Sequence, residues 1–258
     1  MRRALLGILA YVELGGLILL WLPILAVMAR VHRDDPVRRV PGRWIRRLGR
    51  TISRFSPLWS FSTDGTPPAD IHDRAYVVVA NHQSNADPFL LANLPWDMRW
   101  IAKEELAKWP VAGWAFRWGG DIFFRRGHRP SIVRMMKACR DTLDHGLSLM
   151  IFPEGTRSKD GELLPFKAGA FSLAVEKQAP ILPVVLQGTR NCIPRGSKWL
   201  GRARAHARIL EPVSTEGLGA DDVEALMQRV RDRMLQARVE LLAEKPELTG
   251  ARGELPPG

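Results

Sequence analysis

The longest apolar run of the chain lies near its beginning, over residues 4–29, and only Glu13 and Pro23 interrupt it. A helix of this length can span the hydrocarbon core of a bilayer. No small-residue cleavage site closes the run, which predicts a retained membrane anchor; a cleaved signal peptide is the other interpretation. Because a carboxylate is costly at the centre of a membrane, a tilted or half-embedded helix also fits this pattern.

The next segment, residues 30–59, alternates arginines with apolar residues at helical spacing. One face would carry Trp44, Ile45, Leu48, Ile52, Phe55 and Trp59, and the other Arg43, Arg46, Arg47, Arg50 and Arg54. An amphipathic helix lying in a membrane surface has this pattern. A basic helix packed on the following domain has it too, since stripes of Trp and Phe are often core residues.

From residue 76 onward, short strand-like runs alternate with helical patterns. We predict strands at residues 76–80, 122–124, 147–151, 181–186 and 205–210, and helices at 130–146 and 221–242. This alternation favours the α/β class, with a mixed, largely parallel sheet flanked by helices and preceded by the N-terminal membrane-associated helical segment. Pro183 within the fourth run indicates an edge or irregular strand, because proline lacks the N–H of a ladder.

These patterns divide the chain of 258 residues into four parts. Residues 1–62 are predicted to form the membrane anchor and basic amphipathic helix, residues 70–215 the α/β domain, residues 216–245 a C-terminal helix and residues 246–258 a disordered tail. Residues 63–68, with Gly65 and two prolines, have the composition of a linker.

The net charge of +11 is unevenly distributed. Residues 1–63 hold 11 Lys and Arg against three acidic residues, a net +8, and the remaining 195 residues carry only +3. Basic charge beside an apolar segment indicates a bilayer with anionic headgroups as partner rather than nucleic acid, for which no recognition motif is found. By the positive-inside rule, a spanning helix would leave the rest of the chain on the cytoplasmic side of the inner membrane. The only cysteines, Cys139 and Cys192, indicate a reducing compartment, and neither has a metal-ligand spacing.

A polar loop with catalytic residue types follows the first predicted strand. It reads Asn-His-Gln-Ser-Asn-Ala-Asp-Pro-Phe over residues 81–89 and places His82 and Asp87 beyond the carboxyl end of a strand, where open α/β sheets have their active sites. A carboxylate that accepts a hydrogen bond from one ring nitrogen leaves the other nitrogen free as a base. Asp87 followed by Pro88 is also a good helix start, in which case His82 would be an ordinary loop histidine.

A second polar loop, residues 152–158, leaves the strand predicted at 147–151 and reads Phe-Pro-Glu-Gly-Thr-Arg-Ser. Arg157 offers a planar guanidinium suited to phosphate, and Gly155 lets backbone approach a ligand closely. Arg125 and Arg126, at the end of the strand predicted at 122–124, form either a solvated tip or a bidentate phosphate clamp.

In these two loops the chain resembles the glycerolipid acyltransferase family, and most closely its bacterial 1-acyl-sn-glycerol-3-phosphate (lysophosphatidic acid) acyltransferases. The resemblance includes two further blocks in the family's order, residues 120–126 and 179–185, and so covers about residues 75–190. It implies that His82 and Asp87 are catalytic, that no metal or cofactor is needed, and that the acceptor is bound by Arg126, Glu154, Gly155, Thr156 and Arg157. Arg125 leaves the register of the first arginine ambiguous by one. The family often has a second lysine where this chain has Ala168, so Lys167 is left without an assigned role.

The residues and the resemblance together predict transfer of a fatty acyl group from a thioester to the sn-2 hydroxyl of a lysophospholipid acceptor, 1-acylglycerol-3-phosphate, giving phosphatidic acid. His82 would act as general base and Asp87 would fix its tautomer, while Ser84 is a loop hydrogen-bonder rather than a nucleophile. Both acyl-CoA and acyl carrier protein remain open as the donor. The alternatives are an acyltransferase for another lyso-lipid, such as a lyso-ornithine lipid, and a non-catalytic membrane-binding protein, which would leave the two polar loops unexplained.

Overall fold

A computed structural model describes residues 2–194, 196–197 and 199–249. Its centre is a seven-stranded sheet in the order β1-β7-β6-β2-β5-β3-β4. The strands are β1 (Trp59–Asp64), β2 (Val77–Ala80), β3 (Met98–Lys103), β4 (Ile122–Phe124), β5 (Ser148–Ile151), β6 (Ile181–Gln187) and β7 (Ala203–Ile209). Every neighbouring pair is parallel except β6 with β7. The predicted mixed, largely parallel sheet is therefore confirmed.

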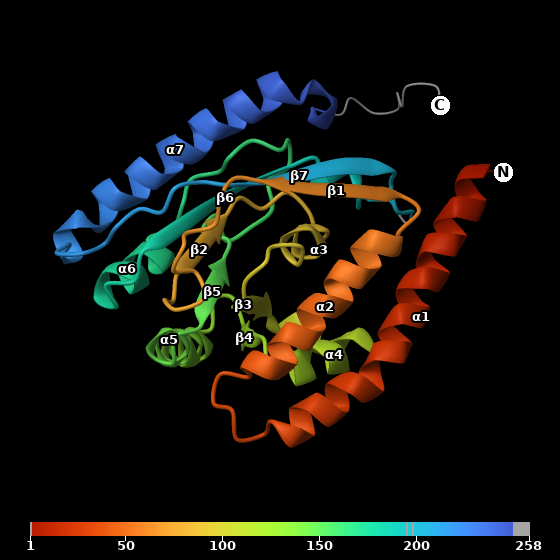
Figure 1. The fold of residues 1–258 in the computed structure, drawn as a ribbon, viewed down its shortest axis with the longest axis horizontal. Helices are drawn as coiled ribbons and strands as arrows, with labels where there is room; N and C mark the ends of the chain where they lie inside the picture. Colours follow the sequence, from red (N-terminus) through yellow and green to blue (C-terminus); the bar gives the residue numbers. More distant parts are fainter. Residues whose placement is uncertain (1, 195, 198, 250–258) are drawn as a thin grey trace.

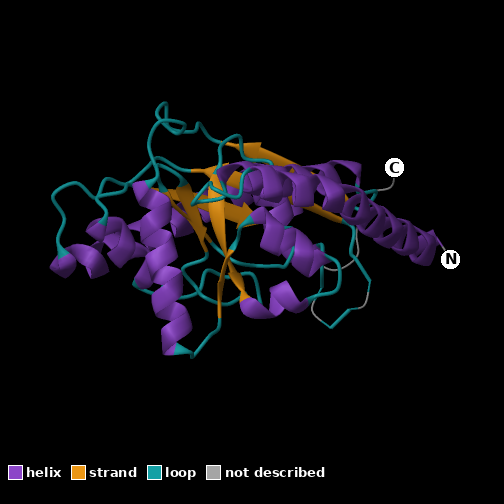
Figure 2. Ribbon diagram, turned by 90° about the horizontal axis from the view of Figure 1, so that it is seen from below, coloured by secondary structure: helices purple, strands orange, loops and turns teal. Residues whose placement is uncertain are grey.

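Helices cover both faces of this sheet (Figures 1 and 2). They are α1 (Arg2–Val31), α2 (Arg39–Phe55), α3 (Asp87–Leu91), α4 (Ala112–Gly119), α5 (Arg129–Asp144), α6 (Gly169–Glu176) and α7 (Val223–Glu244). All four residues of β2 are fully buried: Val77 and Val79 pack with α5, α6 and α7, and Val78 and Ala80 pack with α3 on the other face. A central strand covered on both sides has to be apolar throughout, which explains the run at 77–80.

Pro183 is not on an edge strand, as the sequence suggested, because β6 lies between β7 and β2. Its carbonyl accepts a hydrogen bond from Leu210 N at 3.0 Å, one position beyond the last β6–β7 pair, Val184 with Ile209. The N and the carbonyl of one strand residue point to the same side, so the missing N–H of Pro183 faces the end of this ladder. The proline therefore costs the sheet no bond in the middle of a ladder.

The predicted boundary between the N-terminal segment and the domain is too late. Trp59, assigned above to a helical stripe, begins β1, and β1 pairs with β7 over six positions up to Asp64. The proposed linker thus starts inside a strand. The pattern misled because Trp59 and Phe61 alternate with polar residues in too short a run to distinguish from a helix.

The end of the domain is also later than predicted. Pro246–Leu248 forms a short 3₁₀ helix in which Leu248 is buried against the core of α7. The tail predicted to be disordered therefore includes at least three ordered residues, and its remainder from residue 250 lies outside the described residues.

The apolar stripe of α2 is used for packing. Leu48 and Ile52 are 4% and 3% exposed and lie in a cluster with residues of α1 and α4. The Trp21 indole N–H donates to the Trp44 carbonyl at 3.0 Å, which joins α1 to α2. The interpretation that holds for α2 is the basic helix packed on the domain.

The outer face of α1 is apolar and uncovered. Its exposed side chains are Leu5, Ile8, Leu9, Tyr11, Val12, Leu19, Leu20, Val27 and Val31. Within the part of the chain that the structure describes, residues 5–31 form the one helix that is long and apolar enough to cross a membrane. Since the inner face of α1 packs along α2 and α4, this outer face of α1 is an extended apolar surface that lipid could contact.

Candidate active site

The predicted site residues come from loops at one edge of the sheet. Strands β2, β5, β6, β3 and β4 run parallel, so the segments that leave their carboxyl ends lie at the same edge. His82 follows β2, Glu154 to Arg157 follow β5, and Arg126 follows β4. The sheet topology thus gathers loops that are 72 residues apart in sequence, and the backbone N of His82 donates to Glu154 Oε1 at 3.0 Å.

His82 and Asp87 form a hydrogen-bonded pair. The distance from His82 Nδ1 to Asp87 Oδ2 is 2.7 Å, and the side chains are 17% and 0% exposed. The ring of His82 stacks on Phe152 with centroids 4.1 Å apart. With Nδ1 bound to the carboxylate, the ring presents Nε2 for chemistry, which is the arrangement of a general base with its orienting acid.

Asp87 is held from several sides and does not cap α3. Its Oδ2 also accepts from the backbone N–H groups of Gln83 at 2.8 Å and Ser84 at 3.0 Å, and Thr189 Oγ1 donates to its Oδ1. The residue before α3 is Ala86, and Asp87 makes no cap hydrogen bond to the helix. The helix does begin at Asp87, as the sequence suggested, but its carboxylate does not cap the helix and is turned back toward the His82 loop.

Ser84 has the loop role that the sequence suggested. It is buried, and its Oγ accepts from the backbone N of Ala86 at 3.2 Å.

Glu154 joins the two loops. It is 3% exposed, its Oε1 accepts from His82 N, and Ser158 N donates to the His82 carbonyl at 2.8 Å. Burial raises the pKa of Glu154 to about 7, against the smaller opposing effect of backbone N–H donors. Glu154 therefore positions the backbone of the histidine, and the acceptor contact that the resemblance implies for it stays a prediction.

Cationic side chains surround Gly155. Arg126 donates to the Gly155 carbonyl, and Lys167 lies so close that a Cβ on Gly155 would be 2.9 Å from its Nζ. Burial, and then the charges of Arg126 and Arg157, lower the pKa of Lys103, which places these three cations near one another. Thr156 is exposed beside them. Such a group is suited to an anion with several oxygens, as phosphate is.

Of the two arginines, Arg126 is the one that contacts the second loop, and which of them binds phosphate stays a prediction. Both side chains are exposed, and the backbone N of Arg125 donates to Ser131 Oγ at 2.9 Å. Among the described residues, no group of three or more His, Cys, Asp or Glu could hold a metal ion.

Sequence reasoning missed Lys103, Thr189 and the position of Lys167. Lys103 ends β3, a strand that the sequence pattern does not separate from a tryptophan-rich stretch. Thr189 follows β6 by two residues, in the 3₁₀ helix Thr189–Asn191. A polar residue shortly after a predicted strand of a parallel sheet is a signal that could have found Thr189, whereas Lys103 ends a strand that was not predicted.

Comparison with known proteins identifies the family of the chain. The family model described as Acyltransferase matches residues 63–187. A solved structure, the 1-acyl-sn-glycerophosphate (LPA) acyltransferase PlsC from Thermotoga maritima, superposes with a TM-score of 0.77 and 30% identity, covering 94% of this chain and 97% of that one. The chain belongs to the acyltransferase family.

Two sequence relatives extend this finding to eukaryotes. The acyltransferase is 41% identical over 162 residues to the sheep 1-acyl-sn-glycerol-3-phosphate acyltransferase alpha, covering 62% of this chain and 56% of the relative. It is 36% identical over 179 residues to the Saccharomyces cerevisiae 1-acyl-sn-glycerol-3-phosphate acyltransferase, covering 65% and 57%. The chain thus spans little more than half the length of these relatives.

Proposed function

We propose that this acyltransferase transfers a fatty acyl group from a thioester to the sn-2 hydroxyl of 1-acylglycerol-3-phosphate and so makes phosphatidic acid. The observation that carries the proposal is the pair of His82, partly exposed, and Asp87, fully buried, beside the cations that surround Gly155. A base for a hydroxyl and a site for a phosphate are the two things that this acceptor requires. The names of the relatives, all 1-acylglycerol-3-phosphate acyltransferases, support the same acceptor.

In the proposed reaction, Nε2 of His82 takes the proton of the acceptor hydroxyl while the hydroxyl oxygen attacks the thioester carbonyl. Asp87 holds the ring in the tautomer with a proton on Nδ1 and stabilises the imidazolium that forms. Collapse of the tetrahedral intermediate expels the thiolate, which takes the proton back from His82. General-base assistance of this kind contributes on the order of 10²–10⁴-fold in rate.

Arg126 and Arg157 bind the acceptor phosphate in this proposal, with Lys103 and Lys167 adding positive charge. Gly155 and Thr156 shape the loop on which the phosphate rests, and Glu154 keeps that loop in register with His82. The donor is acyl-CoA or acyl carrier protein, and no cofactor enters the reaction.

We further propose that the exposed apolar face of α1 attaches the protein to the membrane in which the lipid acceptor is found. The proposed place is the cytoplasmic side of the inner membrane, because 11 of the Lys and Arg residues lie in the first 63 positions. Concentrating the enzyme at this surface brings the site to its substrate.

The experiment that tests the function is an acylation assay with detergent-solubilised protein, 1-acylglycerol-3-phosphate or lyso-ornithine lipid as acceptor, and acyl-CoA or acyl carrier protein as donor. We expect turnover of the phosphate acceptor. Turnover of lyso-ornithine lipid alone would keep the general-base mechanism and replace the acceptor. Absence of turnover with every pair would favour the non-catalytic membrane-binding alternative.

A further inference from the structure

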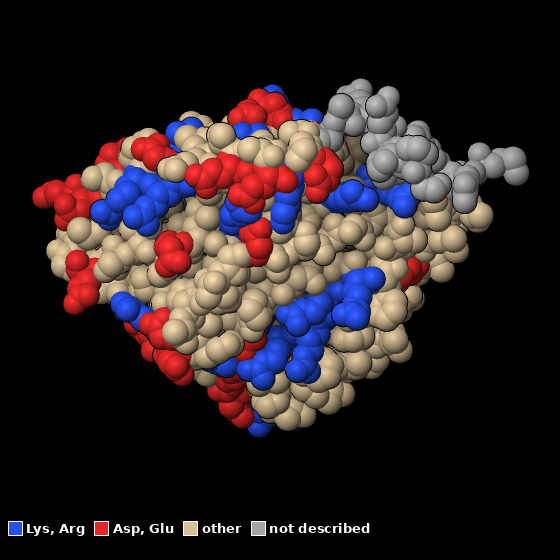
Figure 3. Space-filling model, turned by 45° about the horizontal axis from the view of Figure 1, so that its top comes forward, with Lys and Arg blue, Asp and Glu red and all other residues tan. Residues whose placement is uncertain are grey.

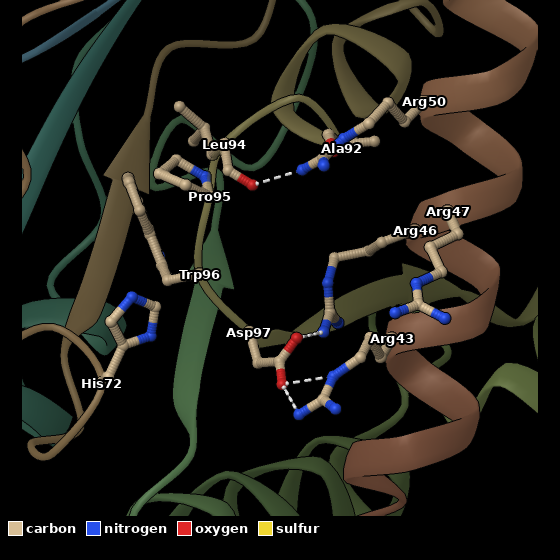
Figure 4. Close-up of a pocket in the computed structure, with 10 residues that line it drawn as sticks. All are labelled: Arg43, Arg46, Arg47, Arg50, His72, Ala92, Leu94, Pro95, Trp96 and Asp97. Carbon is tan, nitrogen blue, oxygen red and sulfur yellow. Dashed lines mark hydrogen bonds and ion pairs between the residues drawn. The ribbon is translucent and has the colours of Figure 1, made fainter.

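A hollow of about 320 Å³ lies between α2 and the segment that follows α3 (Figure 4). Its walls are formed by Arg43, Arg46, Arg47, Arg50, His72, Ala92, Leu94, Pro95, Trp96 and Asp97. Four arginines on one side face a single carboxylate on the other.

The four arginines belong to one face of α2. Their spacing of three and four residues makes them neighbours on the helix surface, where like charges destabilise the helix. Arg46 is 9% exposed, and burial lowers its pKa in spite of the nearby Asp97. This repulsion, to which the buried guanidinium of Arg46 contributes, favours binding of an anion in the hollow.

Protein partners compensate only part of this charge. Arg43 Nη2 and Arg46 Nη2 each lie 2.6 Å from Asp97, at its Oδ2 and Oδ1 respectively. Arg50 donates to the carbonyls of Ala92 and Leu94 at 3.1 and 2.9 Å, and the guanidinium of Arg47 lies 4.8 Å from the centre of the Trp44 ring. With Asp97 as the one acidic residue of the lining, the hollow has an excess of three positive charges.

This hollow is separate from the acceptor site. Asp97 precedes Met98, the first residue of β3, whereas Lys103 of the cation group ends the same strand. A strand of six residues is about 17 Å long, so the two groups of cations lie at opposite edges of the sheet.

We propose that the hollow binds the phosphate headgroup of an anionic membrane phospholipid, at a second site distinct from that of the acceptor. The proposal rests on the membrane attachment proposed above. Arginine suits this ligand because its planar guanidinium forms paired hydrogen bonds with phosphate oxygens.

The position of the hollow favours a lipid over a soluble anion. Helix α2 packs along α1, whose outer face exposes Leu20, Val27 and Val31. Figure 3 shows the basic stripe along α2 bordered by the largely uncharged surface of α1. A lipid whose acyl chain lies against α1 would hold its headgroup phosphate beside the arginines. A free phosphate ion has no acyl chain and gains nothing from α1.

Native mass spectrometry of the full-length protein in a neutral detergent tests the proposal, with titration of phosphatidylglycerol or phosphatidylcholine. All samples carry Arg157→Ala, which weakens the proposed acceptor site, so that the lipid binding measured is that of the hollow. We expect the double variant Arg47→Gln with Arg50→Gln to weaken phosphatidylglycerol binding about 25-fold, because each arginine near a membrane surface contributes about fivefold in affinity. Binding of phosphatidylcholine should stay unchanged.

The matched control is Arg229→Gln with Arg233→Gln, which removes the same charge from the exposed side of α7 and should change binding less than twofold. Because Arg50 also ties α2 to two carbonyls, Arg47→Glu is a second variant that spares those bonds, and it too should weaken phosphatidylglycerol binding at least fivefold.

Equal binding of phosphatidylglycerol by the arginine variants and the control would overturn the proposal. Displacement of the lipid by an equal concentration of inorganic phosphate would overturn it too, because the hollow would then be a site for a soluble anion. A third contrary result would come from immobilised acyl carrier protein. If the arginine variants no longer bound to it but still bound lipid like the control, the arginines would belong to a site for a protein partner. None of these readings depends on turnover.

Discussion

Thr189 donates a hydrogen bond from its hydroxyl to Oδ1 of Asp87, across 102 positions of sequence, and both side chains are fully buried. The other carboxylate oxygen of Asp87 is bound to His82 Nδ1 and to two backbone N–H groups. Thr189 thus fixes the remaining rotation of the carboxylate that orients the base, and it acts through Asp87 rather than on the substrate.

Replacing Thr189 with valine keeps the shape of the side chain and removes the hydroxyl. We expect kcat to fall about tenfold with little change in either KM, because a loss of about 1–1.5 kcal/mol is typical for one buried hydrogen bond. Thr189→Ser, which retains the hydroxyl, should recover most of the activity. Steady-state kinetics of the three proteins measure this, and equal kcat values for the valine and serine variants would remove Thr189 from the positioning role.

Glu154 gives the protein a specific pH dependence of stability. Its pKa is raised from 4.5 to about 7 by burial, so the folded state holds a proton that the unfolded state releases between these values. Stability from this group is therefore full below about pH 4.5 and decreases as the pH rises to about 7, by about 3 kcal/mol on the order-of-magnitude relation between pKa and free energy.

Glu154→Gln tests this dependence, since its amide oxygen can still accept from His82 N. We expect the unfolding free energy of the variant, measured by denaturant titration at pH 5 to 8, to decrease less with pH than that of the wild type. Asp121, whose pKa is also raised to about 7 by burial, contributes the same slope to both proteins. Identical slopes would contradict the assignment.

Gly155 and Gly127 form a matched pair for testing the acceptor loop. Both have positive φ, of 65° and 71°, so alanine should cost each about 1 kcal/mol of stability. A Cβ on Gly155 would also displace Lys167, whereas nothing lies within 4 Å of one on Gly127. We expect Gly155→Ala to raise the acceptor KM at least tenfold and Gly127→Ala to leave it unchanged; equal effects on KM would indicate that backbone strain alone is responsible.

Arg157 should matter for the acceptor and not for the donor. Because its charge lies with those of Lys103 and Arg126, Arg157→Ala should raise the acceptor KM about tenfold or more and leave the thioester KM within about twofold. Kinetics with each substrate varied in turn decide the point. An equal increase in both KM values would remove Arg157 from the acceptor phosphate.

The outer face of α1 can be tested without disturbing the fold. Leu19 and Leu20 are 59% and 62% exposed, so Leu19→Glu with Leu20→Glu should leave the thermal unfolding temperature within a few degrees. The same change should move the protein from the membrane pellet to the supernatant, because charged residues are costly within a bilayer. Retention of the variant in the pellet, in buffer of moderate salt, would show that another surface provides the attachment.

Much of the fold could be predicted from local patterns. The apolar, β-branched run at 76–80 identified a strand, and the alternation of strands with helices gave the class and the largely parallel sheet. The start of the sheet could not be predicted, because β1 is held by pairing with β7, about 140 residues later, and no local pattern specifies a partner. The acidic partner of Arg46 could not be predicted either, since only the fold brings Asp97 to it.

In the candidate site, too, the local contacts could be predicted and the distant ones could not. His82 and Asp87 are five positions apart within one loop, so their pairing follows from local geometry and from the resemblance to a known family. The partners of that pair are distant: Glu154 reaches His82 across 72 positions, and Thr189 reaches Asp87 across 102. Such contacts depend on which strands are neighbours in the sheet, which the sequence alone does not specify.

The most direct test of the central claim is the acylation of 1-acylglycerol-3-phosphate by wild-type protein and by His82→Ala, with folding of both verified by thermal unfolding. The account predicts phosphatidic acid formation by the wild type and a decrease in kcat of about 10²–10⁴-fold in the variant, the range that general-base catalysis supplies. Undiminished turnover by folded His82→Ala would show that the His82–Asp87 pair is not the catalytic base.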